Sequence, residues 1–410
     1  MRVLLVGSGG RESALAWKLA ASPLLAKLWA APGNPGIAQH AECVPIGATD
    51  VARLVAFARE RRVDLVVPGP EAPLVAGLAD AMAEAGVACC GPTAAAARIE
   101  GSKAFAKEVC DAAGVPTARW ERFDRAEAAR EFVRRRGAPI VVKADGLASG
   151  KGVVVAASVE EAEAAVDALL VPGGALVIEE CLEGREASLF ALCDGRDAVF
   201  LGAARDHKRV GDGDTGPNTG GMGAVSPVPG FHPDPAMAGV IRPVLAELAR
   251  RGTPFRGVLF AGLMLTEGGV SVIEFNARFG DPECQALMPL LRSDLLPALM
   301  AACEGELADF ALHWRAEASC AVVMAARGYP AAPAAGGVIG GLAAAERVPG
   351  ALVFQAGTRE ADGALVAEGG RVLTLVGTGP DAAAARKAAY RAVAAVDWPG
   401  GFCRRDIGLG

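Results

Sequence analysis

Short apolar segments alternate with helix-period segments over the first 100 residues of this chain of 410 residues. The apolar segments are VLLVG (3–7), KLWAAPG (27–33), DLVVPGPE (64–71) and VACCG (87–91), and helical patterns such as DVARLVAFARERR (50–62) lie between them. This alternation is typical of a parallel sheet wrapped by helices, with ligands bound where the strands end. We therefore expect an N-terminal doubly wound α/β domain over residues 1–100.

From residue 101 onwards, the pattern changes to strands that meet across short loops. Predicted helices are SKAFAKEVCDAAG (102–114), VEEAEAAVDALL (159–170) and a helix over 236–251, with strands between them. Short connections favour antiparallel α+β construction. We expect one such domain over 101–319 and a small α+β domain over 320–410. The polar, glycine-rich segment 205–226 is predicted to be a long loop, which in compact domains is usually functional.

Composition excludes several classes of protein. With 41 basic and 47 acidic residues, the formal net charge of -6 gives no general attraction to nucleic acid or to an anionic membrane. The ten cysteines are scattered without a C-x-x-C pair, which predicts reduced thiols in a cytoplasmic protein rather than a zinc site. No apolar stretch is suited to a signal peptide or a membrane span.

The segment GSGGRE (7–12) follows the first predicted strand directly. Its glycines would let main-chain N–H groups approach a phosphate at a helix N-terminus, and Arg11 would add charge. A dinucleotide site would require Gly where Glu12 stands, and the second strand lacks a ribose-binding acid. A phosphorylated small substrate, a merely tight turn and a nicotinamide-dependent oxidoreductase are the open interpretations.

A second glycine-rich segment, VVKADGLASGKGVVVA (141–156), leads into a strand instead of the helix that a Walker loop requires. It predicts a hairpin whose tip carries Lys151 and folds over a triphosphate, with Lys143 pointing inward. The alternative is a surface hairpin with a snorkelling lysine.

The segment IEFNARFGDPE (273–283) places a carboxylate, an amide and a guanidinium in one row. On a strand, Glu274, Asn276 and Arg278 share one face, because successive side chains alternate. Glu and Asn oxygens suit Mg2+ or Mn2+, completed by phosphates and water, and Arg278 would stabilise phosphoryl charge. A solvent-facing polar edge is the alternative.

Eight motifs occur in order along the chain: GSGGRE, APGNPG, GPEAPL, EGSKAF, VVKADGLASGKG, DHKRVGDGDTGPNTGGMGA, RFGDPECQ and CRRDIG. Together they resemble the phosphoribosylamine-glycine ligase family of the ATP-grasp superfamily. The resemblance implies an ATP-grasp fold over 101–319 with a mobile lid of about 120–190. It also implies ATP-dependent ligation of glycine to 5-phosphoribosylamine in purine biosynthesis, by a monomer or weak homodimer. Another ATP-grasp ligase or carboxylase is the alternative.

The same resemblance implies roles for individual residues. ATP would contact Lys103, Lys143, Gly150, Lys151, Gly152, Glu179, Glu180 and Glu186. The substrates would contact Gly9, Gly10, Arg11, Glu12, Gly69, Pro70, Glu71, Asp212, Thr215 and Gly216. Arg278 and Asp214 would be catalytic, with Asp214 facing the glycine ammonium group, and Glu274 and Asn276 would bind the metal. The family usually has His where Ser13 stands.

Overall fold

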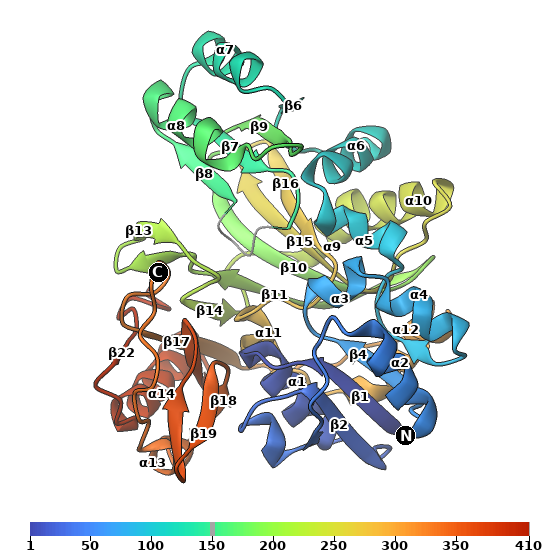
Figure 1. Cartoon of the computed structure of the whole chain (residues 1–410), viewed down its shortest axis with the longest axis vertical. Helices are drawn as coiled ribbons and strands as arrows, with labels where there is room; N and C mark the ends of the chain where they lie inside the picture. The colour runs from blue at the N-terminus through green and yellow to red at the C-terminus, as the bar shows by residue number, and fades with distance from the viewer. Residues whose placement is uncertain (148–151, 410) are drawn as a thin grey trace.

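The computed structural model describes residues 1–147 and 152–409 (Figure 1). Its N-terminal strands are β1 (Arg2–Gly7), β2 (Lys27–Pro32), β3 (Glu42–Cys43), β4 (Leu65–Pro68) and β5 (Ala88–Cys89). They form one sheet in the order β3-β2-β1-β4-β5, and all of its pairings are parallel. The predicted doubly wound parallel sheet is therefore confirmed.

Helices cover both faces of this sheet because its central strand is apolar on both sides. They are α1 (Gly10–Ala20), η1 (Ile37–Gln39), α2 (Val51–Glu60), α3 (Glu71–Val75), α4 (Leu78–Glu84) and α5 (Ala94–Gly101). Leu5 of β1 packs in one core with Leu15 of α1, while Leu4 packs in another with Leu54 of α2.

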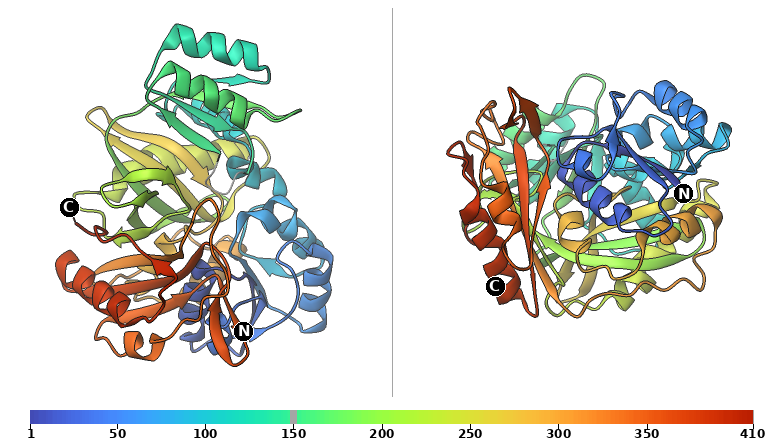
Figure 2. Two further views of the ribbon diagram at one scale, coloured as in Figure 1. Left: turned by 60° about the vertical axis from the view of Figure 1, so that its left-hand side comes forward. Right: turned by 90° about the horizontal axis from the view of Figure 1, so that it is seen from below.

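A four-stranded antiparallel sheet and its two helices lie at the upper end of the molecule in Figure 1 and in the left view of Figure 2. Its strands are β6 (Trp120–Phe123), β7 (Ile140–Ala144), β8 (Val153–Ala156) and β9 (Leu176–Glu180), in the order β6-β9-β7-β8. Helices α7 (Ala126–Arg136) and α8 (Val159–Leu169) complete its core. The pairing of β7 with β8 confirms the predicted hairpin.

The remaining long sheet is antiparallel and has nine strands. Its order is β16 (Gly269–Asn276), β15 (Arg256–Thr266), β10 (Arg185–Asp194), β11 (Ala198–Asp206), β14 (Gly223–Ser226), β17 (Ala318–Ala326), β21 (Arg371–Gly379) and β18 (Ala351–Gln355), with β22 (Gly401–Phe402) beside β17. The sheet continues across the predicted border at residue 319 because β14 pairs with β17. The middle and C-terminal parts therefore share one sheet.

The other elements pack around these sheets. They are α6 (Lys103–Ala113), α9 (Pro233–Ala236), the π-helical turn η2 (Met237–Ile241), α10 (Arg242–Arg250), α11 (Glu283–Leu287), α12 (Leu295–Glu304), α13 (Leu342–Glu346), α14 (Ala382–Ala395) and the hairpin β19 (Thr358–Ala361) with β20 (Ala364–Ala367). Helix α6 begins where Ser102 Oγ accepts a hydrogen bond from Phe105 N, and ends at Gly114 with a left-handed φ of 66°. Among the described helices, none has the length and apolarity needed to cross a membrane.

Segment 205–226 is not the long loop that its composition predicts. It contains the end of β11, the hairpin of β12 (Arg209–Gly211) with β13 (Thr215–Asn218), and all of β14. The glycine and aspartate residues supply the turn of this hairpin, where Asp214 has a φ of 54°. The expectation of a loop was wrong because the glycine and aspartate residues that form the turn of a short hairpin give the segment the same composition as a long loop.

Candidate active site

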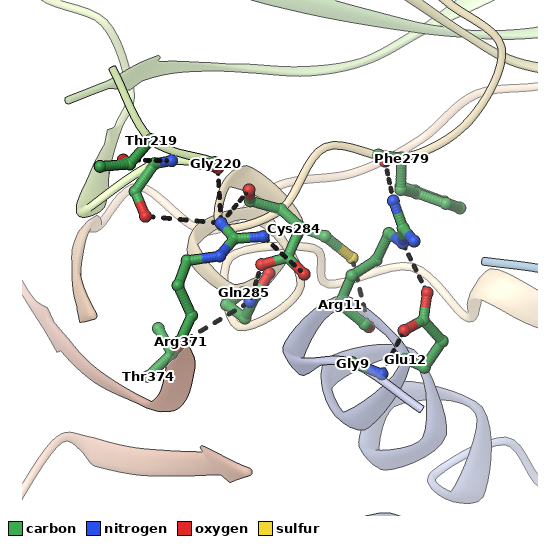
Figure 3. Close-up of polar contacts among 12 residues, drawn as sticks. Gly9, Arg11, Glu12, Thr219, Gly220, Phe279, Cys284, Gln285, Arg371 and Thr374 are labelled. Atoms are coloured by element: carbon green, nitrogen blue, oxygen red, sulfur yellow. Dashed lines mark hydrogen bonds and ion pairs between the residues drawn. The ribbon is translucent and has the colours of Figure 1, made fainter. Parts of the chain in front are cut away.

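The loop between β1 and α1 is held by its own charged side chains (Figure 3). Glu12 Oε2 accepts from Gly9 N at 2.6 Å, which caps the start of α1. Arg11 donates from Nε to Glu12 Oε1 at 2.6 Å and from Nη1 to the Phe279 carbonyl at 3.1 Å. Both charged side chains are buried. Arg11 and Glu12 thus use their polar atoms to shape the loop and to join it to residue 279.

The loop after β4 packs directly against the same carboxylate. A Cβ atom at Gly69 would lie 1.9 Å from Glu12 Oε1, so only glycine allows this approach. The strands β1 and β4 are neighbours in the sheet, and their loops meet at its carboxyl edge. The predicted substrate residues Gly9, Gly10, Gly69 and Pro70 are therefore gathered in one place.

Arg278 joins this edge to the long sheet. Its guanidinium donates to Glu71 Oε2 at 3.1 Å, pairs with Glu100 Oε1 at 2.9 Å, and donates to Asn276 Oδ1 at 3.2 Å. Glu100 Oε2 accepts from Ala277 N at 2.7 Å. Burial raises the pKa of Glu100. Burial would also raise the pKa of Glu71, but the positive charge of Arg278 outweighs it, so the pKa of Glu71 is lowered. One cation therefore satisfies two partly or fully buried carboxylates.

Glu274 and Asn276 lie on one face of β16, as their spacing predicts, opposite Gly262 and Phe260 of β15. Burial would raise the pKa of Glu274, but Lys208, Lys143 and Lys103 outweigh it and lower the pKa. The carboxylate is therefore ionised in a cationic surrounding.

This pair of oxygen donors fits a divalent ion that arrives with phosphates. The described part of the chain has no group of three or more His, Cys, Asp or Glu residues able to hold a metal. Mg2+ commonly takes one or two protein oxygens and completes its shell with phosphates and water. The nearby lysines would attract those phosphates.

The predicted nucleotide residues surround the same strand. Lys103 Nζ donates to the Gly146 carbonyl at 2.9 Å, and Lys143 Nζ donates to the Ile273 carbonyl at 3.1 Å. The carbonyl of Gly152, directly before β8, accepts a hydrogen bond from Ala144 N at 2.8 Å. Gly150 and Lys151 lie outside the described residues.

Three further residues predicted to contact ATP lie at the end of β9 (Glu179 and Glu180) and near the start of β10 (Glu186). Glu180 N donates to the Arg119 carbonyl at 3.0 Å, and Glu180 Oε1 accepts from Arg119 N at 2.9 Å. Glu186 Oε2 accepts from Lys208 Nζ at 2.8 Å. Glu179 is buried between two lysines.

The predicted glycine-binding residues belong to the β12–β13 hairpin. Asp214 Oδ1 accepts from Arg404 Nη1 at 2.6 Å, and Asp212 Oδ1 accepts from Arg405 N at 2.7 Å. Thr215 Oγ1 donates to the Asp212 carbonyl at 2.9 Å. The Gly216 carbonyl accepts from Arg209 at 2.8 Å. These contacts attach the hairpin to the C-terminal tail.

Arg371, at the start of β21, was not found from the sequence because nothing in its local pattern points to the site. Its Nη1 donates to the Gly220 carbonyl at 2.5 Å and to the Asp281 carbonyl at 2.6 Å (Figure 3). Gly220 N in turn donates to Tyr329 Oη at 3.0 Å. The C-terminal part thus holds two glycine-containing loops together, 219–221 and 279–282.

Two further carboxyl groups meet beside these loops. Burial and the charge of Glu283 raise the pKa of Asp206, and burial likewise raises the pKa of Glu283. Ser188 Oγ donates to Glu283 Oε1 at 3.1 Å, and His207 N donates to Asp206 Oδ1 at 2.7 Å. Glu283 was not predicted as a site residue from the sequence, although its position in the RFGDPE motif could have indicated it. Such a pair retains a proton to a higher pH than separate carboxyls do.

Family models match almost all of the chain. The N domain of phosphoribosylglycinamide synthetase matches residues 1–100, its ATP-grasp (A) domain matches 101–284, and its C domain matches 319–410. The chain belongs to the phosphoribosylglycinamide synthetase family. The strand β16 and the Arg278 network thus lie in the segment that matches the ATP-grasp domain of this family.

Relatives of this synthetase family align over the full length. The phosphoribosylamine-glycine ligase of Brucella melitensis is 55% identical, covering 100% of this chain and 97% of its own. The chloroplastic enzyme of Arabidopsis thaliana is 50% identical over 97% of this chain and 78% of its own. The crystal structure of the Thermotoga maritima ligase, 34% identical, superposes with a TM-score of 0.87 over 99% of this chain and 100% of its own.

More distant structures share the synthetase fold alone. The biotin carboxylase domain of a Hydrogenobacter thermophilus 2-oxoglutarate carboxylase, solved with MgADP, is 19% identical with a TM-score of 0.72, over 98% of this chain and 91% of its own. With the family assigned, the oxidoreductase interpretation of the N-terminal sheet is excluded.

The hydrogen bonds by which Arg371 holds loops 219–221 and 279–282 together lead to a testable expectation. Arg371→Met should lower kcat about tenfold to a hundredfold, because each lost charge-assisted hydrogen bond is worth about 1.5–3 kcal/mol. Steady-state phosphate release would measure it. Arg359→Met, which removes an exposed arginine from the neighbouring β19, is the matched control. Unchanged turnover in Arg371→Met would show that the two loops hold their positions without these hydrogen bonds.

Proposed function

We propose that the chain ligates glycine to 5-phosphoribosylamine, with cleavage of ATP to ADP and phosphate, as a step of purine biosynthesis. The name of the full-length relatives supports this reaction. The observation in the structure that carries this proposal is the guanidinium of Arg278, which contacts both Glu71, predicted to bind a substrate, and Asn276, predicted to bind the metal. In this proposal, the amine substrate and the metal-bound nucleotide would both lie beside Arg278.

The chemistry requires activation because the glycine carboxylate is a poor electrophile. In the proposed mechanism, a carboxylate oxygen forms a bond to the γ-phosphorus while the bond to ADP breaks, giving glycyl phosphate. The amine nitrogen then attacks the carbonyl carbon, and phosphate leaves with the bridging oxygen. Arg278 would stabilise the charge on the transferring group. The Asp206 and Glu283 pair would accept the proton that the amine loses.

Nucleotide binding would use the residues around β16. We assign the phosphates to Lys103 and Lys143, with Lys151 closing over them, and the ribose to Glu186. Glu274 and Asn276 would hold Mg2+ or Mn2+, which supplies charge neutralisation and orientation of the phosphates when bound.

The carboxyl edge of the parallel sheet would take the ribose 5-phosphate. Gly9, Gly10, Gly69 and Pro70 are assigned to line its site, and the contacts of Arg11 make that residue a support of the loop. For the glycine ammonium group Asp214 stays our candidate. Its side chain is 58% exposed, although Arg404 already binds it, so an ammonium group would share the carboxylate.

Isotope transfer tests the intermediate. Glycine labelled with 18O in its carboxylate should pass one labelled oxygen to the released phosphate in each turnover, because the bridging oxygen leaves with phosphorus. Mass spectrometry of the phosphate measures it, and a reaction without phosphoribosylamine is the control. Unlabelled phosphate during ligation would overturn the proposed order of bond formation.

We also propose a cytoplasmic location and a monomer or weak homodimer. All ten cysteines lie among the described residues and are free thiols, which agrees with a reducing compartment.

A further inference from the structure

The buried carboxylate of Glu179 lies between two lysines from different parts of the fold. Lys143 of β7 pairs with Oε1, and Lys107 of α6 pairs with Oε2. All three residues are at most 4% exposed. Removing such charges from water is costly unless each is paired, so the three groups depend on one another.

The same lysines are tied to the strand that carries the predicted metal ligands. Lys107 Nζ donates to Thr117 Oγ1 at 2.7 Å, and this hydroxyl donates to the Val272 carbonyl at 2.7 Å. Lys143 Nζ donates to the Ile273 carbonyl at 3.1 Å. Ile273 is the extra residue where the pairing of β15 with β16 shifts, directly before Glu274.

The charges of this group explain why two lysines are present. A single pair of Glu179 with Lys143 would be neutral and would offer no net attraction to phosphate. Lys107 forms an ion pair with the second carboxylate oxygen and leaves the group of three with one net positive charge.

We propose that Lys107 is a positioning residue for ATP, which acts through Glu179 to keep the ammonium group of Lys143 in place and available to the nucleotide phosphates. Lys107 lies one helical turn after Lys103, so both lysines project from one face of α6. The inference rests on the proposed function only in its use of ATP.

A charge-rescue experiment tests this role without any need for turnover. The dissociation constants of a non-hydrolysable Mg·ATP analogue and of adenosine would be measured by calorimetry for wild type, Lys107→Met, Glu179→Gln and the double variant. We expect Lys107→Met to weaken the ATP analogue about tenfold or more, because a buried charged contact is lost, while adenosine changes little. The double variant should recover to within roughly threefold of wild type, since its remaining lysine faces a neutral amide.

Several outcomes would overturn the proposal. They are an unchanged affinity of Lys107→Met for the ATP analogue, an equal loss for adenosine, or a double variant that binds no better than Lys107→Met. A purely structural role would weaken the binding of adenosine and of the ATP analogue alike. If Lys107→Met does not fold, Lys107→Arg keeps the charge and should retain ATP affinity, and a tenfold loss there would also contradict the proposal.

The control is Lys18→Met, which removes a half-buried lysine that donates to the Leu291 carbonyl from α1. It should leave nucleotide affinity unchanged. Ligase activity, measured separately with glycine and phosphoribosylamine, reports on the proposed function. If the double variant recovers affinity for the ATP analogue but the wild-type protein shows no ligase activity, the role of Lys107 is supported and the assigned reaction is rejected.

Discussion

Glu274→Gln is expected to reduce kcat by roughly a hundredfold to a thousandfold, the range seen when one preorganised electrostatic contact to a reacting group is removed. The substitution keeps the volume of the side chain and removes an anionic oxygen from the proposed metal pair. Because the surrounding lysines favour the ionised form of this carboxylate, its neutral replacement loses their attraction, and urea unfolding of the variant should be measured beside its activity. Phosphate release at saturating substrates, followed over a range of Mg2+ concentrations, measures the loss.

The matched control for this prediction is Glu267→Gln, which makes the same chemical change at the exposed turn between β15 and β16. It should retain wild-type turnover. Full activity of Glu274→Gln at ordinary Mg2+ would remove Glu274 from the metal site.

Arg278→Met should abolish measurable ligation and also destabilise the fold. Removing one partner of a buried ionic network costs about 3–5 kcal/mol, because the remaining charges stay buried without compensation. Here Glu71 and Glu100 would both lose their cation. Equilibrium unfolding in urea measures the change in the free energy of unfolding, and phosphate release measures the activity.

A triple variant separates the two effects of this change. Arg278→Met combined with Glu71→Gln and Glu100→Gln removes the uncompensated charges and should regain most of the lost stability. It should stay inactive, because the guanidinium is still missing. Recovery of activity together with stability would show that Arg278 only supports the fold.

Local patterns predicted the parts of the structure that depend on neighbours in sequence. The alternation of residues 1–100 predicted the parallel sheet, and the spacing of Glu274 and Asn276 predicted their shared face, because strand geometry alone decides both. The capping residue Ser102 and the terminal glycine at 114 likewise define α6 from within.

Contacts between distant segments could not be predicted in this way. Arg371 reaches the loop at Asp281 only because β17 and β21 extend the long sheet. Asp214 was expected in a free loop, and its pairing with Arg404 depends on the path of the C-terminal tail. The burial of Arg11 follows from the approach of residue 279, which the local motif does not encode.

The continuous nine-stranded sheet has a consequence for how the chain can be divided. β14 exchanges main-chain hydrogen bonds with β17 from Gly223 opposite Val322 to Ser226 opposite Ser319. A fragment ending before β17 would expose those unpaired groups as an open edge, which other chains can extend by adding strands. The C-terminal part is thus required to complete the long sheet. A shortened protein would tend to aggregate and would not form a smaller, independent enzyme.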